Sequence, residues 1–163
     1  MYIREGRGIH VASADKRVDG FWSDNSLNGL GRIIESGFMF KGFFKDGKRD
    51  GYGIEKSLGG NSYHGHFKDD KKCGNGIYKN KAAGTEYDGE WYNNRKNGLG
   101  KLNWPNGNEY FGEWVNDERK GQCVYTFNTG EKYEGEWHCE MKHGYGTLYE
   151  LDGGRYTGNW SYN

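Results

Sequence analysis

Histidine and cysteine are the residues of this chain whose types could bind a metal ion or act as a nucleophile. His64 and His66 lie two positions apart, so they would share one face of a strand and form a candidate chelating pair. A second group, His138, Cys139 and His143, lies within one short segment. Neither group has a spacing typical of zinc sites. The sequence also lacks a nucleophile motif, a phosphate-binding loop and an acid–base pair. We therefore expect no catalysis, no metal and no cofactor.

Basic residues recur in pairs that could bind an acidic surface. The pairs are Lys48-Arg49, Lys71-Lys72, Arg95-Lys96, Arg119-Lys120 and Lys142-His143. Placed along one edge of a sheet, they would form a basic row able to contact acidic phospholipids such as phosphoinositides, or an acidic protein segment. The alternative interpretation is a set of solvated turns, because nearby acidic residues such as Asp70 and Asp117 partly cancel the positive charge.

The bulk composition argues against several classes of protein. The 23 basic and 23 acidic residues balance, whereas a nucleic-acid-binding domain usually carries a basic excess. No apolar run approaches the ~20 residues of a membrane span, and the first residues do not resemble a signal peptide. The three cysteines, Cys73, Cys123 and Cys139, are odd in number and far apart. We therefore expect a reducing, cytoplasmic environment without a disulfide framework.

Glycine and aromatic residues dominate the chain and follow an internal repeat. Aromatic residues make up 17% of the sequence, too many for a disordered polar chain. The glycines of the Tyr-x-Gly-x-Trp phrases are 22 to 24 residues apart: Gly20, Gly42, Gly65, Gly89, Gly112, Gly135 and Gly158. A Gly-x-Gly phrase begins nine residues after each of the first six. The connection of constant length predicts a tight turn between paired strands, because a one-residue slip would exchange the faces of the sheet. The connection of variable length predicts a surface loop.

These repeats predict an all-β fold: an elongated, twisted, single-layer antiparallel β-meander of about 14 strands without helix. We expect a single domain over residues 1–163. It would comprise a half repeat at 1–17, repeats that begin near residues 18, 40, 63, 87, 110 and 133, and a half repeat at 156–163. Strand alternation places Tyr133, Gly135 and Trp137 on one face and the intervening glutamates on the other. Each glycine leaves a notch in which a neighbouring ring can be buried.

The phrase Tyr-x-Gly-Glu-Trp, a short polar turn and then Gly-x-Gly, at a 23-residue period, resembles the MORN (membrane occupation and recognition nexus) repeat. The resemblance covers nearly the whole chain, from Gly6 to Trp160. Phe40, Phe44 and Phe67 replace the usual tyrosine or tryptophan, and Cys123 replaces a glycine. The resemblance implies a non-catalytic module that docks to proteins, to cytoskeletal structures or to membranes.

The aromatic face is the candidate partner-binding groove. One interpretation is that its rings are simply the core of the protein. The other is that they line a groove for a peptide or a partner helix, since a single sheet leaves this face uncovered. The predicted groove residues are Tyr63, Phe67, Tyr87, Trp91, Tyr110, Trp114, Tyr133, Trp137, Tyr156 and Trp160.

The leading hypothesis is therefore a protein-interaction scaffold within a cytoskeletal or ciliary assembly. The alternative is a peripheral membrane module that binds acidic phospholipids through the basic row: Lys48, Arg49, Lys71, Lys72, Arg95, Lys96, Arg119, Lys120 and Lys142. We also expect that the terminal strands, as exposed sheet edges, could pair with another copy of the chain. Nucleic acid is not an expected partner.

Overall fold

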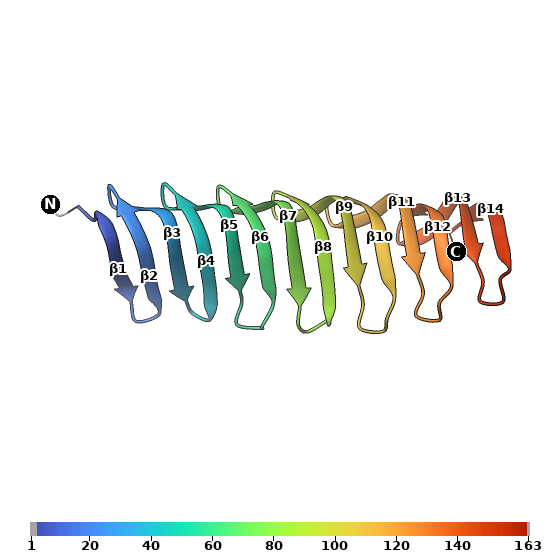
Figure 1. Cartoon of the computed structure of the whole chain (residues 1–163), viewed down its shortest axis with the longest axis horizontal. Coiled ribbons are helices and arrows are strands. Elements are labelled where there is room, and N and C mark those ends of the chain that lie inside the picture. Colours follow the sequence, from blue (N-terminus) through green and yellow to red (C-terminus); the bar gives the residue numbers. More distant parts are fainter. Residues whose placement is uncertain (1–2, 163) are drawn as a thin grey trace. The chain divides into compact units, whose positions relative to one another are not determined.

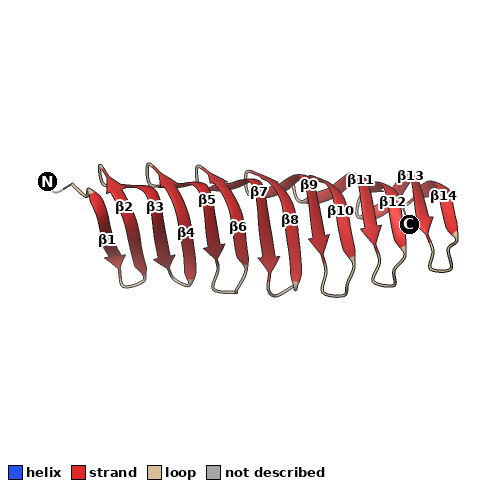
Figure 2. Ribbon diagram, viewed as in Figure 1, coloured by secondary structure: helices blue, strands red, loops and turns tan. Residues whose placement is uncertain are grey.

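The computed structural model describes residues 3–162, which form fourteen strands and no helix (Figure 2). The predicted all-β class and number of strands are thus confirmed. The chain divides into two compact units, Met1–Ala82 and Ala83–Asn163. Each unit is a single-layer antiparallel meander whose strands are hydrogen-bonded in chain order.

A helix able to cross a bilayer is not found in the part of the chain that the structure describes.

The first unit contains seven strands that follow one another in order (Figure 1). They are β1 (Gly6–Ser13), β2 (Lys16–Ser23), β3 (Ser26–Glu35), β4 (Phe38–Lys45), β5 (Lys48–Lys56), β6 (Ser62–Lys68) and β7 (Lys71–Asn80). The register places the repeat glycines opposite one another, as in the pairs Gly20↔Gly31 and Gly42↔Gly53. Two backbones without side chains therefore face each other at the centre of each hairpin.

The second unit repeats this arrangement with seven further strands (Figure 1). They are β8 (Thr85–Tyr92), β9 (Arg95–Asn103), β10 (Glu109–Val115), β11 (Glu118–Thr126), β12 (Lys132–His138), β13 (Met141–Tyr149) and β14 (Arg155–Ser161). Gly89↔Gly100 and Gly135↔Gly146 are paired, whereas Gly112 faces Cys123.

The connections of constant length are two-residue turns, which explains why their length does not vary. Asn93 and Asn94 join β8 to β9 with φ angles of 50° and 69°. Two successive residues with positive φ form the hairpin turn that matches strand twist, and asparagine and aspartate tolerate that conformation. Asp69 and Asp70 do the same between β6 and β7.

The connections of variable length are loops, as the repeat spacing predicts. Between β9 and β10, the amide of Gly107 donates to the carbonyl of Trp104 at 3.0 Å, and Gly107 has a φ of 90°. This is a three-residue hairpin loop that ends in a left-handed glycine. Between β3 and β4 the loop shortens to Ser36 and Gly37, both with positive φ. The missing residue of that repeat is therefore lost from a turn and not from a strand.

Candidate functional site

Each repeat tyrosine lies flat over the glycines of its own hairpin. The Tyr87 hydroxyl donates to the backbone carbonyl of Glu90 at 2.9 Å, three residues further along the strand. A Cβ atom placed on Gly100 would lie 2.3 Å from the Tyr87 hydroxyl oxygen. Only a glycine at position 100 leaves the ring room to lie there. Tyr63, Tyr110 and Tyr133 make the same hydrogen bond to residues 66, 113 and 136.

The following hairpin covers each ring from above. In the second unit Tyr87 meets Trp114 edge to face, with ring centroids 5.2 Å apart, and Tyr133 meets Trp160 at 5.5 Å. Phe40 and Phe67 form the equivalent pair of the first unit at 5.0 Å. Edge-to-face contacts at such distances add to the free energy gained by burial. The tyrosine ring is thus packed between the glycines of its own hairpin and an aromatic ring of the following hairpin, which we call the aromatic cover.

The structure places most predicted groove residues in the core of their own unit. Exposed fractions are only 0–7% for eight of them: Tyr63, Phe67, Tyr87, Trp91, Tyr110, Trp114, Tyr133 and Trp137. Trp160 is half-buried, and Tyr156 is 49% exposed. The first eight side chains therefore build the fold. Their role as a groove for a partner stays a prediction.

The basic row divides between two faces of the sheet. Its five ring-facing members cover the aromatic rings: Arg49, Lys72, Lys96, Arg119 and Lys142. Lys96 Nζ lies 4.7 Å from the ring centroid of Trp114, and Lys142 Nζ lies 4.3 Å from that of Trp160. A cation over an aromatic face is attracted by the π electrons. The exposed members are Lys48, Lys71, Arg95 and Lys120.

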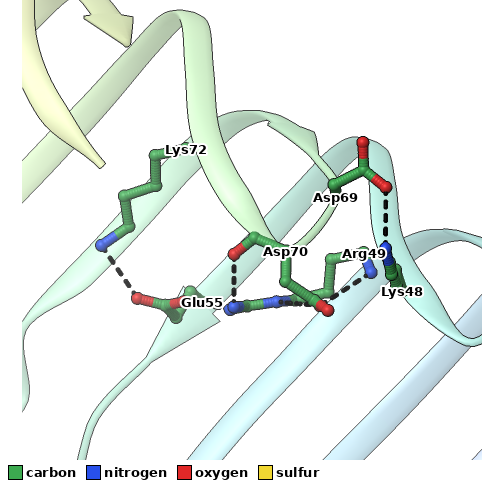
Figure 3. Close-up of polar contacts among 6 residues, drawn as sticks. All are labelled: Lys48, Arg49, Glu55, Asp69, Asp70 and Lys72. Carbon is green, nitrogen blue, oxygen red and sulfur yellow. Dashed lines mark hydrogen bonds and ion pairs between the residues drawn. The ribbon is translucent and has the colours of Figure 1, made fainter. Parts of the chain in front are cut away.

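Acidic residues of β5 and of the turn between β6 and β7 hold the ring-facing cations Arg49 and Lys72 in position (Figure 3). The Arg49 guanidinium donates to Asp70 Oδ1 at 3.1 Å and forms an ion pair of 2.5 Å with Glu55. Lys72 forms an ion pair of 2.9 Å with the same Glu55. Outside this network, Lys48 pairs with Asp69 at 3.1 Å. These acids therefore cancel much of the positive charge along this edge of the first unit.

Burial changes the proton affinity of both the cations and the rings. Desolvation lowers the pKa of Lys96, Arg119 and Lys142 from their ordinary values. Desolvation also raises the pKa of Tyr133 to about 12. The ring-facing side of the sheet is thus a largely desolvated layer in which cations lie over aromatic rings.

The glutamate of the Tyr-x-Gly-Glu-Trp phrase, the motif glutamate, has a structural role on the side of the sheet opposite the rings. We call this side the outer face. Glu90 and Glu136 each accept the backbone N–H that lies between the two glycines of the next strand, such as Leu99 N–H at 2.9 Å. Glu113 accepts the equivalent Gln122 N–H, where Cys123 replaces the second glycine. In the first unit the equivalent position holds Phe21, Phe43 or His66. The first unit therefore places apolar or imidazole side chains where the second unit places carboxylates.

As a result, the first unit has an exposed outer apolar row, defined as Phe21, Leu30, Phe43 and Tyr52. These four side chains are 46–51% exposed. Leu30 is paired with Phe43 across β3 and β4, and Tyr52 is paired with His66 across β5 and β6. Sequence reasoning missed this row. Strand alternation, together with the loss of the motif glutamate, was the signal that could have revealed it.

Basic side chains surround one end of the outer apolar row. They line a hollow of about 790 Å³, the first hollow, with Phe21 and Leu30 in its wall. Its charged residues are Arg7, Arg17, Asp19, Arg32 and Lys41. Asp19 pairs with Arg32 at 2.7 Å and more loosely with Arg17 at 3.8 Å. Arg7 and Lys41 have no acidic partner within residues 3–162.

The second unit has a hollow of opposite charge on its own outer face. This second hollow, of about 490 Å³, contains Leu99, Phe111 and Tyr145 in its wall, and their side chains are 50–60% exposed. Its charged residues are Glu113 and Glu134. The whole units follow the same trend. Residues 1–82 contain 15 basic and 10 acidic side chains, whereas residues 83–163 contain 8 basic and 13 acidic ones.

The histidine and cysteine groups do not assemble into a metal cluster. The rings of His138 and His143 have centroids 5.6 Å apart, and Cys139 is exposed in the turn between them. His64 lies on β6 opposite Ile54 and Ile77. No group of three potential ligands gathers anywhere in the described range 3–162.

Comparison with known proteins gives one family, and the similar solved structures include two domains that were determined with a bound peptide or motif. The model of the MORN repeat matches residues 40–61, 63–80, 87–109, 110–132 and 133–155.

One similar structure is the TCP domain of Drosophila melanogaster SAS-4 (dCPAP), determined in complex with a proline-rich motif of Ana2 (dSTIL). It has 13% identity and a TM-score of 0.47, over 94% of this chain and 90% of that one. Another is the wild-type TCP10 domain of Danio rerio CPAP in complex with a STIL peptide. Its identity is 14% and its TM-score 0.31, over 94% and 84% of the two chains. No curated protein matches the chain.

Proposed function

This chain belongs to the MORN repeat family, and from that premise we propose that it is a non-catalytic module that binds an acidic segment of another protein. The binding surface is the outer face of the first unit. The observation that carries the proposal is the outer apolar row beside the unpaired cations of the first hollow. A contiguous exposed apolar surface with a polar rim is typical of a protein-interaction site.

The chemistry of the surface indicates what the partner offers. The apolar row crosses the four strands β2–β5, a distance of roughly 14 Å at ~4.8 Å per strand. Roughly four to five residues of extended chain cover that distance. Such a segment would place one or two large apolar side chains against Phe21 and Leu30. Its carboxylates would then reach Arg7 and Lys41, whose charges are free to pair.

The outer face supports the proposal better than the row of buried rings. Eight predicted groove residues have little surface left to offer a partner. Phe21 and Leu30, in contrast, are half-exposed and can lose solvent contact on binding. Burying two such side chains would contribute on the order of 2–4 kcal/mol before the entropic cost of binding.

The cellular setting is part of the proposal and follows from the family resemblance alone. We propose a cytoplasmic scaffold within a cytoskeletal or ciliary assembly. The alternative of a module bound to acidic phospholipids through the basic row is less favoured, because five of its members cover rings and Lys48 is paired with Asp69.

Selection from a random peptide library tests the proposal. Peptides of about twelve residues, displayed on phage, would be selected on the immobilised chain. Their affinity for the wild-type chain would then be compared with their affinity for an Arg7→Glu/Lys41→Glu variant. We expect enriched peptides to combine acidic and aromatic residues, and to lose about tenfold or more in affinity for the variant. The matched control is Lys48→Glu/Lys71→Glu, which changes the charge equally at the turns and should bind as wild type does.

Two outcomes would contradict this function. One is a set of enriched peptides that bind the Arg7→Glu/Lys41→Glu variant as tightly as wild type. The other is flotation of the chain with phosphoinositide vesicles that is lost in the Lys48→Glu/Lys71→Glu control, which would favour the membrane module instead.

A further inference from the structure

We propose that the outer face of the second unit binds the outer face of the first unit on another copy of the chain. The inference uses the same first-unit surface as the proposed function but requires no other protein. Its basis is that one chain carries two hollows of opposite charge, each with exposed apolar side chains in its wall.

The charges of the two hollows are complementary. The first hollow has four basic side chains and one acidic one. The charged side chains of the second hollow are both acidic: Glu113, which accepts the Gln122 N–H, and Glu134, which also pairs with Lys132 at 2.8 Å. From the residue counts above, the formal charge is +5 for residues 1–82 and −5 for residues 83–163. Opposite surface potentials accelerate the encounter of two molecules and fix their orientation, while they disfavour contact between two like faces.

The apolar surfaces are also matched. Phe21 and Leu30 in the first hollow are 50% and 51% exposed, and Leu99 and Phe111 in the second hollow are likewise 50% and 51% exposed. Phe111 lies in a cross-strand row whose acidic residues are Asp88 on β8 and Glu134 on β12, with Lys101 and Val124 between. The two carboxylates lie at the ends of this row, two strands from Phe111, whereas Arg7 is paired directly with Phe21 across β1 and β2.

A second copy is the occupant that this complementarity favours. Both faces belong to the same chain, so they are always present in equal amounts. The contact joins two different surfaces, which makes it heterologous. Heterologous contacts of this kind link copies into rings or open chains. This contact differs from the pairing of terminal edge strands, since it buries side chains on the faces of the sheets.

Charge-swap variants test the proposal with purified full-length protein. Arg7→Glu/Lys41→Glu reverses the first face, and Asp88→Lys/Glu134→Lys reverses the second. Sedimentation equilibrium at low salt should show that the wild-type average mass rises with concentration, and that each variant alone associates about tenfold or more weakly. An equimolar mixture of the two variants should regain the wild-type association, because each variant then offers the face that the other lacks.

Controls separate the specific contact from the effects of net charge. Lys48→Glu/Lys71→Glu and Glu118→Lys/Glu150→Lys make the same changes in net charge at turns and strand ends, and should associate as wild type does. Circular dichroism should show that all variants keep their strand content. Salt of about 1 M, which shortens the screening length to about 3 Å, should weaken the wild-type association.

The inference is overturned if the wild-type chain stays monomeric at every concentration in low salt, if the face variants associate like wild type, or if mixing them restores nothing. None of these results would affect the proposed function. Asp88→Lys/Glu134→Lys keeps its first face intact, so it should still bind the acidic peptides selected on wild type.

Discussion

Trp137 is stacked on Tyr125, with ring centroids 5.3 Å apart and ring planes only 3° from parallel. Its indole Nε1 is buried and finds no hydrogen-bond partner among the residues that the structure describes. Trp114 and Trp160 instead donate Nε1 to the carbonyls of Gly100 and Gly146, fourteen residues earlier. The residue fourteen positions before Trp137 is Cys123. The Cys123 side chain occupies the notch that a glycine leaves open elsewhere, and the indole takes a different orientation.

Cys123→Gly should therefore return Trp137 to the orientation of the other tryptophans. A crystal structure of the variant should show Nε1 donating to the carbonyl of residue 123, with the parallel stacking on Tyr125 lost. The free energy of unfolding should change by no more than about 1 kcal/mol, because the new hydrogen bond offsets the greater freedom of glycine. An unchanged Trp137 orientation would mean that Cys123 is not the cause.

Gly100→Ala should destabilise the second unit by about 1–3 kcal/mol, because the new methyl group would lie within 2.5 Å of the Tyr87 ring. Gly8→Ala is the matched control. Its Cβ would contact only Trp22, at 3.6 Å, so this change should be neutral or stabilising by up to about 1 kcal/mol. Urea unfolding of both variants checks the prediction, and equal midpoints would contradict the glycine-notch interpretation.

Arg119→Ala should cost about 1–2 kcal/mol of stability. The Arg119 side chain is only 13% exposed, and its guanidinium lies 5.0–5.3 Å from the ring centroids of Trp104, Tyr110 and Trp137. Lys120→Ala removes the adjacent, exposed cation and should change stability by less than about 0.5 kcal/mol. Thermal unfolding compares the two. If they lose equal stability, the cover of cations contributes nothing to the fold.

Alkaline pH should unfold the protein in a transition coupled to its tyrosines. Burial raises the pKa of Tyr133 to about 12, and raises the pKa values of Tyr63, Tyr87 and Tyr110 further still. An unfolded phenol titrates near 10. The folded state therefore holds these protons more tightly, and their contribution to stability is complete below about pH 10 and lost as the pH rises through the folded-state values.

Thermal unfolding midpoints and phenolate absorbance, followed together from neutral to strongly alkaline pH, check this prediction. Tyr133→Phe removes one of the groups and should make the loss of stability with pH less steep. Ionisation of all the tyrosines near pH 10 while the strands stay intact would show that the rings are not protected.

Cys139→Asn should stabilise the turn between β12 and β13 by about 0.5–1 kcal/mol. Cys139 has a φ of 47° at the turn position where Asn93, two repeats earlier, has a φ of 50°. Asparagine tolerates this left-handed conformation better than cysteine does. The reciprocal change, Asn93→Cys, should lose a similar amount. Chemical unfolding of the pair would disprove the turn argument if both changes shifted stability in the same direction.

Strand spacing and alternation predicted most of the fold but only part of the site. The constant nine-residue step predicted the tight turns. The pairing of Gly89 with Gly100 does not follow from that step, because it depends on a register shift between Gly89 and Trp91. The same alternation places Arg49 on the face of Gly51 and Gly53, so the ring-facing cations could have been inferred. The orientation of Trp137 could not, because it depends on how one side chain fills a three-dimensional notch.

The aromatic cover in the second unit has a direction along the chain, since Tyr87 is enclosed by Trp114 and Tyr133 by Trp160. A ribosome releases the polypeptide from its N-terminus. In each newly emerged hairpin the tyrosine ring therefore stays exposed to solvent until the next hairpin has left the exit tunnel. Packing of the core within this unit is complete only one repeat behind translation.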